Sequence, residues 1–328
     1  MGKKYNNLLE KIADMDNIRL AYKLAVKGGN KDCPDHLEFK EHLEVNLYEI
    51  RQELINETYE HSAYYSFPVK DPKPRVIFAL PFRDRVVQHA INNIINPIFE
   101  KTFYPCSFAC RKNKGTHKGV KAVQSTLRRL EGKLYFLKMD FSKYFSSLNS
   151  SLLIWAIKRK IKDNRVVNLM CKFINTVGVY IGNLMSQLYA NIYGHLFDTF
   201  AKVKLKLKHY FRYVDDSVVI SSSKNMLIST QKRLKRFIGI FLKLKFSKWQ
   251  IESVEEKSIN FLGYKIRRNY KLVRSDSIVR AKRKIKLYLE SGQAEKLEMF
   301  LASWYGHIKM SNSYNLKNKI KELMLWWI

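Results

Sequence analysis

The sequence predicts an α+β protein, with helices at both ends of the chain and β-strands in its middle. Apolar residues recur at helical spacing in residues 5–27 and 35–58, and again after residue 276. Two apolar runs, 133–140 and 209–221, are rich in residues that favour strands, and the second run bends at a pair of acids. With 328 residues, the chain is long enough for more than one subdomain.

Between the two ends, periodicity and turn residues predict the remaining elements in order. They are a hairpin at 65–80 with prolines in its turn, a helix from 81 to about 99, helices at 150–162 and 165–176, a long helix ending near 208, a basic helix at 225–245, a short hairpin at 260–264, and helices at 276–291, 293–304 and 314–327.

The charge of the chain favours a polyanionic partner. It carries 60 basic and 29 acidic residues, a formal net charge of +31. This charge is spread over the whole sequence and is not gathered beside an apolar anchor, so nucleic acid is favoured over a membrane surface. No apolar run approaches the roughly 20 residues of a membrane span, and the start lacks the apolar core of a signal peptide. The four cysteines show no disulfide or zinc pattern, which favours a reducing compartment, the cytoplasm.

Three aspartates mark the candidate catalytic centre. Asp215 and Asp216 lie at the bend of the run 209–221, and Asp140 ends the strand 133–140. Adjacent carboxylates repel unless a cation neutralises them, and Mg²⁺ prefers carboxylate oxygen. Taken alone, the two aspartates at this bend are equally consistent with an ordinary polar hairpin tip. A third acid on a neighbouring strand favours a two-metal site for nucleotidyl transfer.

These motifs resemble the palm of reverse transcriptases, and the resemblance extends over about residues 60–310 with the motifs in the family's order. It implies a right-hand polymerase fold with fingers, a palm built on an antiparallel sheet flanked by helices, and an α-helical thumb. The implied division is an N-terminal helical extension (1–60), fingers (61–135), a palm (136–264) with finger-side helices inserted at about 150–176, and a thumb (265–328).

In the fingers, the hairpin 65–80 places Lys73 and Arg75 at or just after its turn. Two turn cations are ordinarily solvated, but the resemblance implies that they grip the triphosphate of the incoming nucleotide. The following run, Arg83-Asp84-Arg85-Val86-Val87-Gln88, resembles the fingers helix of group II intron and related bacterial reverse transcriptases. Asp84 and Arg85, near the start of this helix, equally suit a capping and surface pair.

Three further regions are expected to contact template and primer. The loop 107–119 gathers cations before a helix, which suits a phosphate backbone, and the resemblance assigns it to the template. The hairpin 260–264 resembles the primer grip, and the first thumb helix is strongly basic. The residues expected to bind template or primer are Arg111, Lys112, Lys114, His117, Gly263, Arg280, Arg283 and Lys284.

The residues after Asp140 are expected to select the sugar. The backbone from Phe141 onward turns away from the strand, where the resemblance places it against the triphosphate. Phe145 stands at the position where reverse transcriptases keep a bulky aromatic side chain, which would exclude a ribose 2′-hydroxyl. Without that spacing, Phe145 would be read as a core residue.

The most diagnostic segment contains Ile181, Gly182, Ser186 and Gln187. Most bacterial reverse transcriptases show Gln-Gly-x-x-x-Ser-Pro here, so Ile181 and Gln187 depart from the common pattern. The departure resembles the reverse transcriptases of diversity-generating retroelements, which copy RNA with frequent errors opposite adenine. Ile181, Gly182 and Gln187 are therefore expected near the nucleotide, where a lost polar contact weakens discrimination; neutral drift is the alternative.

The resemblance also implies the cofactor and partners. It predicts two Mg²⁺ ions, with Mn²⁺ able to substitute, and deoxynucleoside triphosphates, retroelement template RNA and the RNA–cDNA hybrid. It also predicts an accessory variability determinant protein, and no membrane. A lysine is expected to protonate pyrophosphate, and the sequence leaves Lys245 and Lys248 open. The rivals are a retron-like or intron-like enzyme of ordinary fidelity and a non-catalytic RNA-binding scaffold.

Overall fold

The structure is a computed structural model that describes residues 3–29, 31–70 and 74–325. The chain forms two compact units, each assembled from separate stretches of sequence. The first unit comprises Met1–Pro105, Phe141–Leu205 and Leu234–Phe246, and the second comprises Cys106–Asp140, Lys206–Arg233 and Ser247–Ile328. No helix in the described stretches combines the length and the apolar character that crossing a membrane requires.

The first unit begins with four helices: α1 (Leu9–Ile12), α2 (Met15–Lys27), α3 (Pro34–Glu41) and α4 (Leu43–Ile55). The two long helices predicted for 5–27 and 35–58 are therefore wrong, because each is broken. At the first break, the Asp14 carboxylate accepts hydrogen bonds from the amides of Asp16 and Asn17, which caps α2. At the second, His42 has a non-helical backbone.

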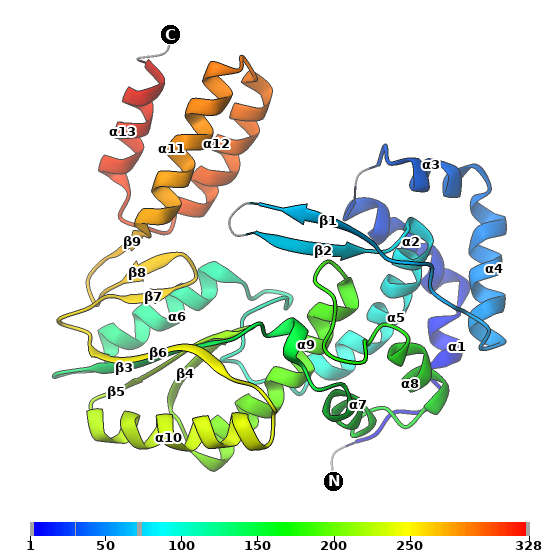
Figure 1. Cartoon of the computed structure of the whole chain (residues 1–328), viewed down its shortest axis with the longest axis horizontal. Helices are drawn as coiled ribbons and strands as arrows, with labels where there is room; N and C mark the ends of the chain where they lie inside the picture. Colours follow the sequence, from blue (N-terminus) through cyan, green and yellow to red (C-terminus); the bar gives the residue numbers. More distant parts are fainter. Residues whose placement is uncertain (1–2, 30, 71–73, 326–328) are drawn as a thin grey trace. The chain divides into compact units, whose positions relative to one another are not determined.

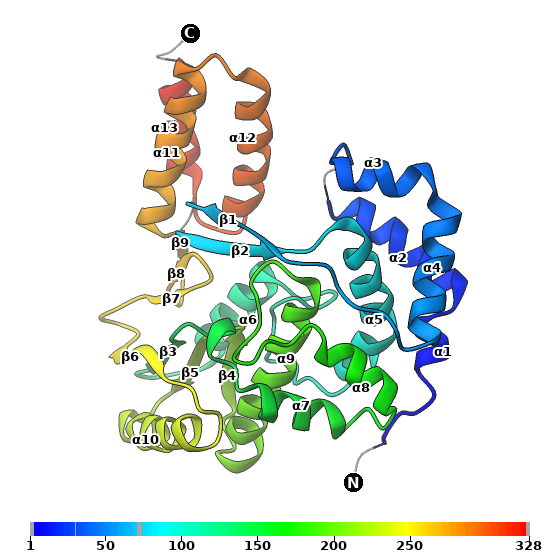
Figure 2. The same ribbon diagram turned by 45° about the vertical axis from the view of Figure 1, so that its right-hand side comes forward.

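The predicted hairpin and the helix after it are confirmed. Strands β1 (Tyr65–Val69) and β2 (Arg75–Ala79) pair antiparallel, and α5 (Phe82–Glu100) follows. Residues 71–73, which join the two strands, lie outside the described part of the chain. Helix α2 packs along α5 (Figure 2), and its residues Ile18, Ala21 and Ala25 are fully buried.

The rest of the first unit is helical. It contains a 3-10 turn η1 (Phe145–Ser147), α7 (Ser150–Lys158), α8 (Asn164–Cys171), α9 (Leu184–Thr199) and a π-helical turn η2 (Phe200–Lys204). These helices are shorter than predicted, since α8 ends at Cys171 and the long helix becomes a π-helix at Phe200. Helix α10 (Lys224–Ile240) also ends earlier than the predicted 245.

The second unit is built on a four-stranded sheet with the strand order β4-β5-β3-β6 (Figure 1). Its strands are β3 (Tyr135–Phe141), β4 (His209–Tyr213), β5 (Asp216–Ser221) and β6 (Phe246–Ser253). Both predicted strands, 133–140 and 209–221, are present, the latter as the hairpin β4–β5. Phe136, Val218 and Ile220 belong to one buried cluster with the apolar stripe of α6 (Thr116–Arg129).

The same core continues into the C-terminal part of the unit. A three-stranded sheet contains β7 (Ile259–Phe261), β8 (Tyr264–Ile266) and β9 (Lys271–Val273), which confirms the short hairpin at 260–264. The helices α11 (Ser275–Glu290), α12 (Ala294–Ile308) and α13 (Tyr314–Leu325) follow and lie side by side (Figure 1). Ile285, Leu301 and Trp304 bury the facing sides of this bundle within the common cluster.

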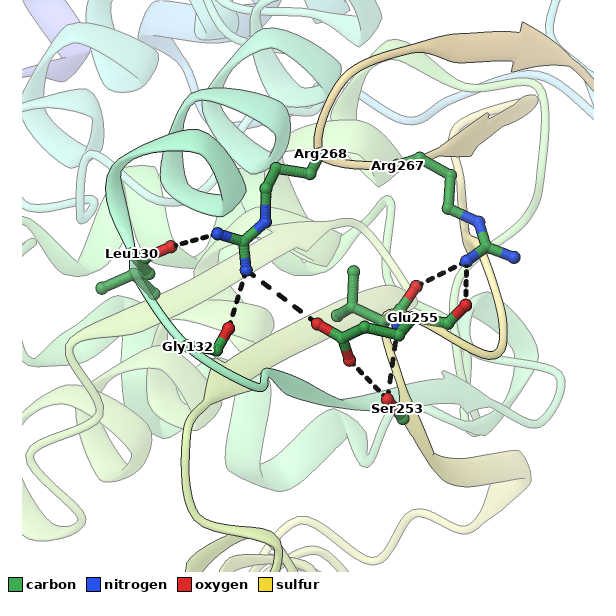
Figure 3. Close-up of polar contacts among 7 residues, drawn as sticks. Leu130, Gly132, Ser253, Glu255, Arg267 and Arg268 are labelled. Carbon is green, nitrogen blue, oxygen red and sulfur yellow. Dashed lines mark hydrogen bonds and ion pairs between the residues drawn. The ribbon is translucent and has the colours of Figure 1, made fainter.

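Two consecutive arginines fasten the loop between β8 and β9 (Figure 3). Arg267 donates to the main-chain carbonyls of Val254, Glu255 and Glu256, and Arg268 donates to those of Leu130 and Gly132. Carbonyl oxygens at helix ends and in turns need hydrogen-bond donors, and a guanidinium group supplies several N–H donors in one fixed plane. Part of the positive charge of the chain therefore serves the fold of the second unit.

Candidate active site

The antiparallel ladder of the second unit brings two of the three predicted acids face to face. Asp140 on β3 and Asp216 on β5 are direct cross-strand partners, and Asp215 precedes Asp216 in the turn between β4 and β5. The backbone thus gathers the three aspartates at one end of the sheet. This register follows from the alternation of the strands, since a slip by one residue would turn the acids to opposite faces.

The turn that carries the acids is strained. Tyr213 pairs with Asp216, which leaves a loop of Val214 and Asp215, and Val214 has φ +53°. Two-residue hairpin loops need positive φ at their first position, which normally favours glycine. A β-branched residue there is an outlier that persists only when its surroundings fix it.

Asp216 is also bound by a lysine that sequence reasoning did not find. Lys138 on β3 donates a hydrogen bond to the Asp216 carboxylate, and their side chains are only 14% and 24% exposed. Burial raises the pKa of Asp216 to about 6; Lys138 acts in the opposite direction, and the charges of Asp140 and Asp215 add to the increase. The signal in the sequence was Lys138 two residues before Asp140, on the same face of one strand.

The carboxylates of the three aspartates are chemically suited to bind a divalent cation, although their side chains do not converge on one point. Within residues 3–29, 31–70 and 74–325, no three acidic, imidazole or thiol groups converge closely enough to hold a metal ion. Asp140 and Asp215 nevertheless act electrostatically on Asp216, so their negative charges share one neighbourhood. A set of carboxylate oxygens suits a hard divalent cation, and a cation there would relieve the repulsion.

The two candidate general acids lie before and within β6. The carbonyl of Lys245 accepts a hydrogen bond from the Ser142 amide, 2.9 Å, in the first unit. Lys248 belongs to β6 itself, next to Ser247, whose hydroxyl donates to the carbonyl of Asp140 at 3.1 Å. Both lysine side chains are exposed, so the choice between them stays open.

In the first unit, the segment after Asp140 has one buried and one partly exposed aromatic ring. The ring of Phe141 is buried against Tyr144, Phe197 and Phe246, and contact of its backbone with a triphosphate stays a prediction. The ring of Phe145 is partly exposed, and its carbonyl accepts from the Val179 amide at 2.9 Å. A Cβ on Gly178 would lie 2.7 Å from that carbonyl oxygen. The absence of a side chain at Gly178 therefore lets the backbone pack closely against the turn at Phe145.

The segment that contains Ile181 and Gly182 is hydrogen-bonded to strand β2 of the hairpin β1–β2. The Phe78 amide donates to the carbonyl of Ile181 at 2.9 Å. Gly182 has φ +121°, and a Cβ there would lie 2.6 Å from the Ile77 Cγ2 atom and from the Phe78 oxygen. Glycine at position 182 therefore lets the loop pack closely against β2. The approach of this glycine to a nucleotide stays a prediction. Gln187 is exposed on the first turn of α9.

Gln88 is a second residue that sequence reasoning missed. Its side chain, on α5, is 1% exposed, and its amide nitrogen donates to the Asn183 side chain while its oxygen accepts from the Leu184 amide. Asn183 in turn donates to the hydroxyl of Tyr64. These contacts fix the chain immediately after Gly182. Gln88 ends the run that resembled the fingers helix, which was the only signal in the sequence.

The predicted phosphate-binding cations occupy separate places. In the first unit, Arg75 is exposed at the start of β2, and Lys73 lies outside the described residues. In the second unit, the basic loop (107–119) is partly ordered by its own contacts, since Arg111 donates to the carbonyl of Ser107 and Lys114 lies over the Phe108 ring. Lys112 and His117 in this loop are exposed.

The predicted primer-grip and thumb residues belong to one continuous part of the second unit. Gly263 has φ +87° and lies against the ring of His307 on α12, 3.4 Å from the position of an added Cβ. On α11, Arg283 is exposed, Lys284 lies over the Phe300 ring, and Arg280 forms an ion pair with Asp276. Of these three predicted cations, Arg283 is therefore the exposed one.

Part of the chain is similar in sequence to known proteins. The chain is 28% identical over 175 residues to protein YkfC of Escherichia coli (strain K12), covering 48% of this chain and 46% of that protein. It is also 28% identical over 174 residues to the group II intron-encoded protein LtrA of Lactococcus lactis subsp. cremoris, covering 47% of this chain and 28% of LtrA. The chain therefore spans less than half of the length of these curated relatives.

A solved structure supports the fold. Telomerase from Candida albicans in complex with a fragment of telomeric RNA superposes with a TM-score of 0.51 at 12% identity, covering 75% of this chain and 55% of that one. The predicted fold class, a right-hand polymerase with mixed helices and antiparallel sheet, is confirmed. The boundaries of fingers, palm and thumb stay a prediction. The family described as reverse transcriptase (RNA-dependent DNA polymerase) matches residues 68–266, more than half of the chain, and the chain therefore belongs to the reverse transcriptase family.

Proposed function

We propose that this chain is an RNA-directed DNA polymerase, in which the 3′-hydroxyl of a primer attacks the α-phosphate of a deoxynucleoside triphosphate. The observation that carries the proposal is the cross-strand pair of Asp140 and Asp216, with Asp215 beside it in the turn. A non-catalytic RNA-binding scaffold has no chemical need for three acids at the end of one sheet.

Reverse transcriptases generally use divalent metals, and the proposal assigns Asp140, Asp215 and Asp216 to hold two Mg²⁺ ions, with Mn²⁺ as a substitute. When bound, the metal supplies positive charge that stabilises the attacking and leaving oxygens. The chain's own residues have other tasks. Phe145 excludes a 2′-hydroxyl, Arg75 and Lys73 bind the triphosphate, and Lys245 or Lys248 protonates pyrophosphate.

The proposed RNA partner is supported by charge and by exposed cations. The net charge of +31 favours a polyanion, and Lys112, His117 and Arg283 are exposed in the second unit. We assign the basic loop to the template and α11 to the RNA–cDNA hybrid. Binding to phosphate predicts that affinity for many RNAs falls steeply as the salt concentration rises.

Primer extension tests this function. The purified chain is given a primed RNA template, Mg²⁺ or Mn²⁺, and either deoxynucleotides or ribonucleotides. We expect extension with deoxynucleotides, in products that deoxyribonuclease degrades. Templated products made only from ribonucleotides, or no extension with either metal, would contradict the proposal.

We further propose that the enzyme belongs to the diversity-generating group and copies its retroelement RNA with errors at adenine, for mutagenic retrohoming in the cytoplasm. Support comes from Ile181, whose side chain offers no amide, in a loop that Gln88 and β2 hold in place. The similarity to a group II intron-encoded protein favours the rival, an intron-like enzyme of ordinary fidelity. Sequencing cDNA made on one template separates them, because uniform error rates at all four bases favour the rival.

The proposed partners have their own test. Processive copying of the cognate template should need the retroelement RNA and the accessory variability determinant protein, because template choice on the bare protein depends on phosphate contacts that carry no sequence information. Extension assays with and without each partner measure this dependence. Long, template-specific cDNA made by the chain alone on a bare template would remove the partners from the proposal.

A further inference from the structure

Arg212 is a buried arginine placed next to the strained catalytic turn. It lies on β4, its side chain is 0% exposed, and its guanidinium Nη1 donates to the carbonyl of Val214 at 3.0 Å. Val214 is the residue with φ +53° that immediately precedes Asp215. Arg212 therefore holds the peptide group that joins the strained residue to the first acid of the pair.

The other end of the same guanidinium is fixed on the basic loop. Its Nη2 donates to the hydroxyl of Ser107 at 3.1 Å, and Ser107 is 0% exposed. Main-chain bonds reinforce this contact, since the Arg212 amide donates to the Cys106 carbonyl at 2.9 Å and the Phe108 amide donates to the Arg212 carbonyl at 3.0 Å. All of these groups belong to the second unit, so the contacts lie within one compact body.

The chemistry explains why arginine is suited to this position. A left-handed backbone at a β-branched residue is unfavourable and needs surrounding contacts that over-determine it. A charge-assisted hydrogen bond to the carbonyl of that residue is such a contact. The guanidinium plane reaches two acceptors at once in a fixed geometry, whereas a lysine ammonium is a single point at the end of a flexible chain.

We infer that Arg212 is a positioning residue that holds Val214 in its left-handed conformation and anchors the catalytic turn on Ser107 of the basic loop. The inference rests on the proposed polymerase function for its kinetic consequence. Arg212 itself does not touch substrate. It sets the direction of Asp215 and Asp216, and through them the affinity of the site for a divalent cation and the rate of the chemical step.

The test compares Arg212→Lys with Arg267→Lys, a matched change at an arginine that also binds main-chain carbonyls of the second unit but is remote from the turn. The first readout is Mn²⁺ binding by the protein without nucleic acid, followed by electron paramagnetic resonance. We expect Arg212→Lys to weaken Mn²⁺ binding and to lower kcat by about tenfold or more, with the Kd for primed RNA nearly unchanged. Arg267→Lys should lower the Tm and leave Mn²⁺ binding unchanged.

A second background makes the inference specific. Asparagine tolerates the left-handed conformation, so Val214→Asn should make the turn less dependent on Arg212. The loss of Mn²⁺ affinity caused by Arg212→Lys should therefore be smaller in the Val214→Asn protein than in the Val214 protein. Ser107→Ala should give a partial loss of Mn²⁺ affinity, and Ser107→Thr, which keeps a hydroxyl, should restore it.

Two results would overturn the inference: Mn²⁺ binding equal in wild type and Arg212→Lys, or an equal loss in both backgrounds at position 214. Because Mn²⁺ binding is measured without synthesis, it reports on the positioning role even if the wild-type chain makes no DNA. Failure of the proposed function would appear instead as a wild-type protein that binds Mn²⁺ and RNA but does not extend a primer.

Discussion

Asp140 and Asp216 face each other as cross-strand partners in the antiparallel ladder of β3 and β5, and Lys138 binds the second of them. Like charges directly opposite each other destabilise a sheet. The lysine partly compensates this repulsion, but burial together with the charges of Asp140 and Asp215 still raises the pKa of Asp216 to about 6. The carboxylates at this end of the sheet therefore lower the stability of the fold, and a bound cation would relieve that cost.

This relationship predicts a pH-dependent stability. An aspartate whose pKa rises from 3.8 to about 6 on folding binds more protons in the folded state within that window, so its contribution to stability is lost as the pH rises through it. Asp216→Asn should lack this loss. In EDTA at pH 7, we expect the variant to be more stable than wild type by up to about 3 kcal/mol, and the difference should shrink toward pH 4.

Urea unfolding at several pH values measures this difference. Glu298→Gln, a neutralisation at an exposed position of α12, is the control and should show no comparable pH dependence. Equal stability of wild type and Asp216→Asn at pH 7 would show that the Asp216 carboxylate is not destabilised by burial and by its neighbours.

Phe145 is predicted to select the sugar. Phe145→Ala should open space for a 2′-hydroxyl, so the kcat/KM for ribonucleotides relative to deoxynucleotides should rise by about tenfold or more. Single-nucleotide extension with each sugar measures the ratio. Phe173→Leu, a change in the buried core of the same unit, should lower stability without altering the ratio. An unchanged ratio for Phe145→Ala would make Phe145 a structural residue.

Gly182 is predicted to be irreplaceable for a structural reason. A Cβ there would lie 2.6 Å from two atoms of β2, and the backbone has φ +121°, so Gly182→Ala should destabilise the first unit by about 2–4 kcal/mol. Gly239→Ala is the matched control, because its added Cβ meets no atom within 4 Å, and alanine there should stabilise α10 by up to about 1 kcal/mol. Thermal unfolding distinguishes them, and equal Tm shifts would contradict the close approach.

Ile181 is predicted to set fidelity. A glutamine amide would regain a polar contact worth about 1–3 kcal/mol of discrimination, so Ile181→Gln should lower errors opposite adenine by roughly ten- to two-hundredfold, with synthesis retained. Ile181→Leu keeps an apolar side chain and should leave the error rate high. Sequencing cDNA from the three proteins on one template gives the rates. An adenine error rate unaffected by glutamine would return weight to the enzyme of ordinary fidelity.

The sequence predicted the strands that carry the three acids, because the apolar runs 133–140 and 209–221 are local information. The role of the acids themselves stays a prediction. The side-chain contacts within each unit were not predictable in the same way. Lys138 reaches Asp216 only through the register of β3 and β5, and Gln88 meets Asn183 across 95 residues of chain. Such contacts depend on tertiary packing, so the local pattern around each residue does not reveal its partner.

The missed helix breaks have a different cause. The apolar stripe runs across Asp14 with little interruption, yet its carboxylate accepts the amides of Asp16 and Asn17 and starts a new helix there. Capping of this kind competes with continuation of a helix by a small free energy, which periodicity does not reveal. The burial of a charged side chain was equally hidden in the sequence. Arg212 is a basic residue in a strand, and nothing in its neighbours indicated that it would be fully buried.

The most direct test of the account is primer extension on RNA by Asp215→Asn and Asp216→Asn proteins, with RNA binding measured on the same preparations. A neutral amide does not anchor Mg²⁺ as a carboxylate does, while the basic surface is untouched. We therefore predict that DNA synthesis is abolished in both variants and that the Kd for primed RNA stays within about twofold of wild type, since phosphate contacts dominate binding. Substantial extension by either variant in Mg²⁺ would contradict the assignment of these aspartates as the catalytic centre.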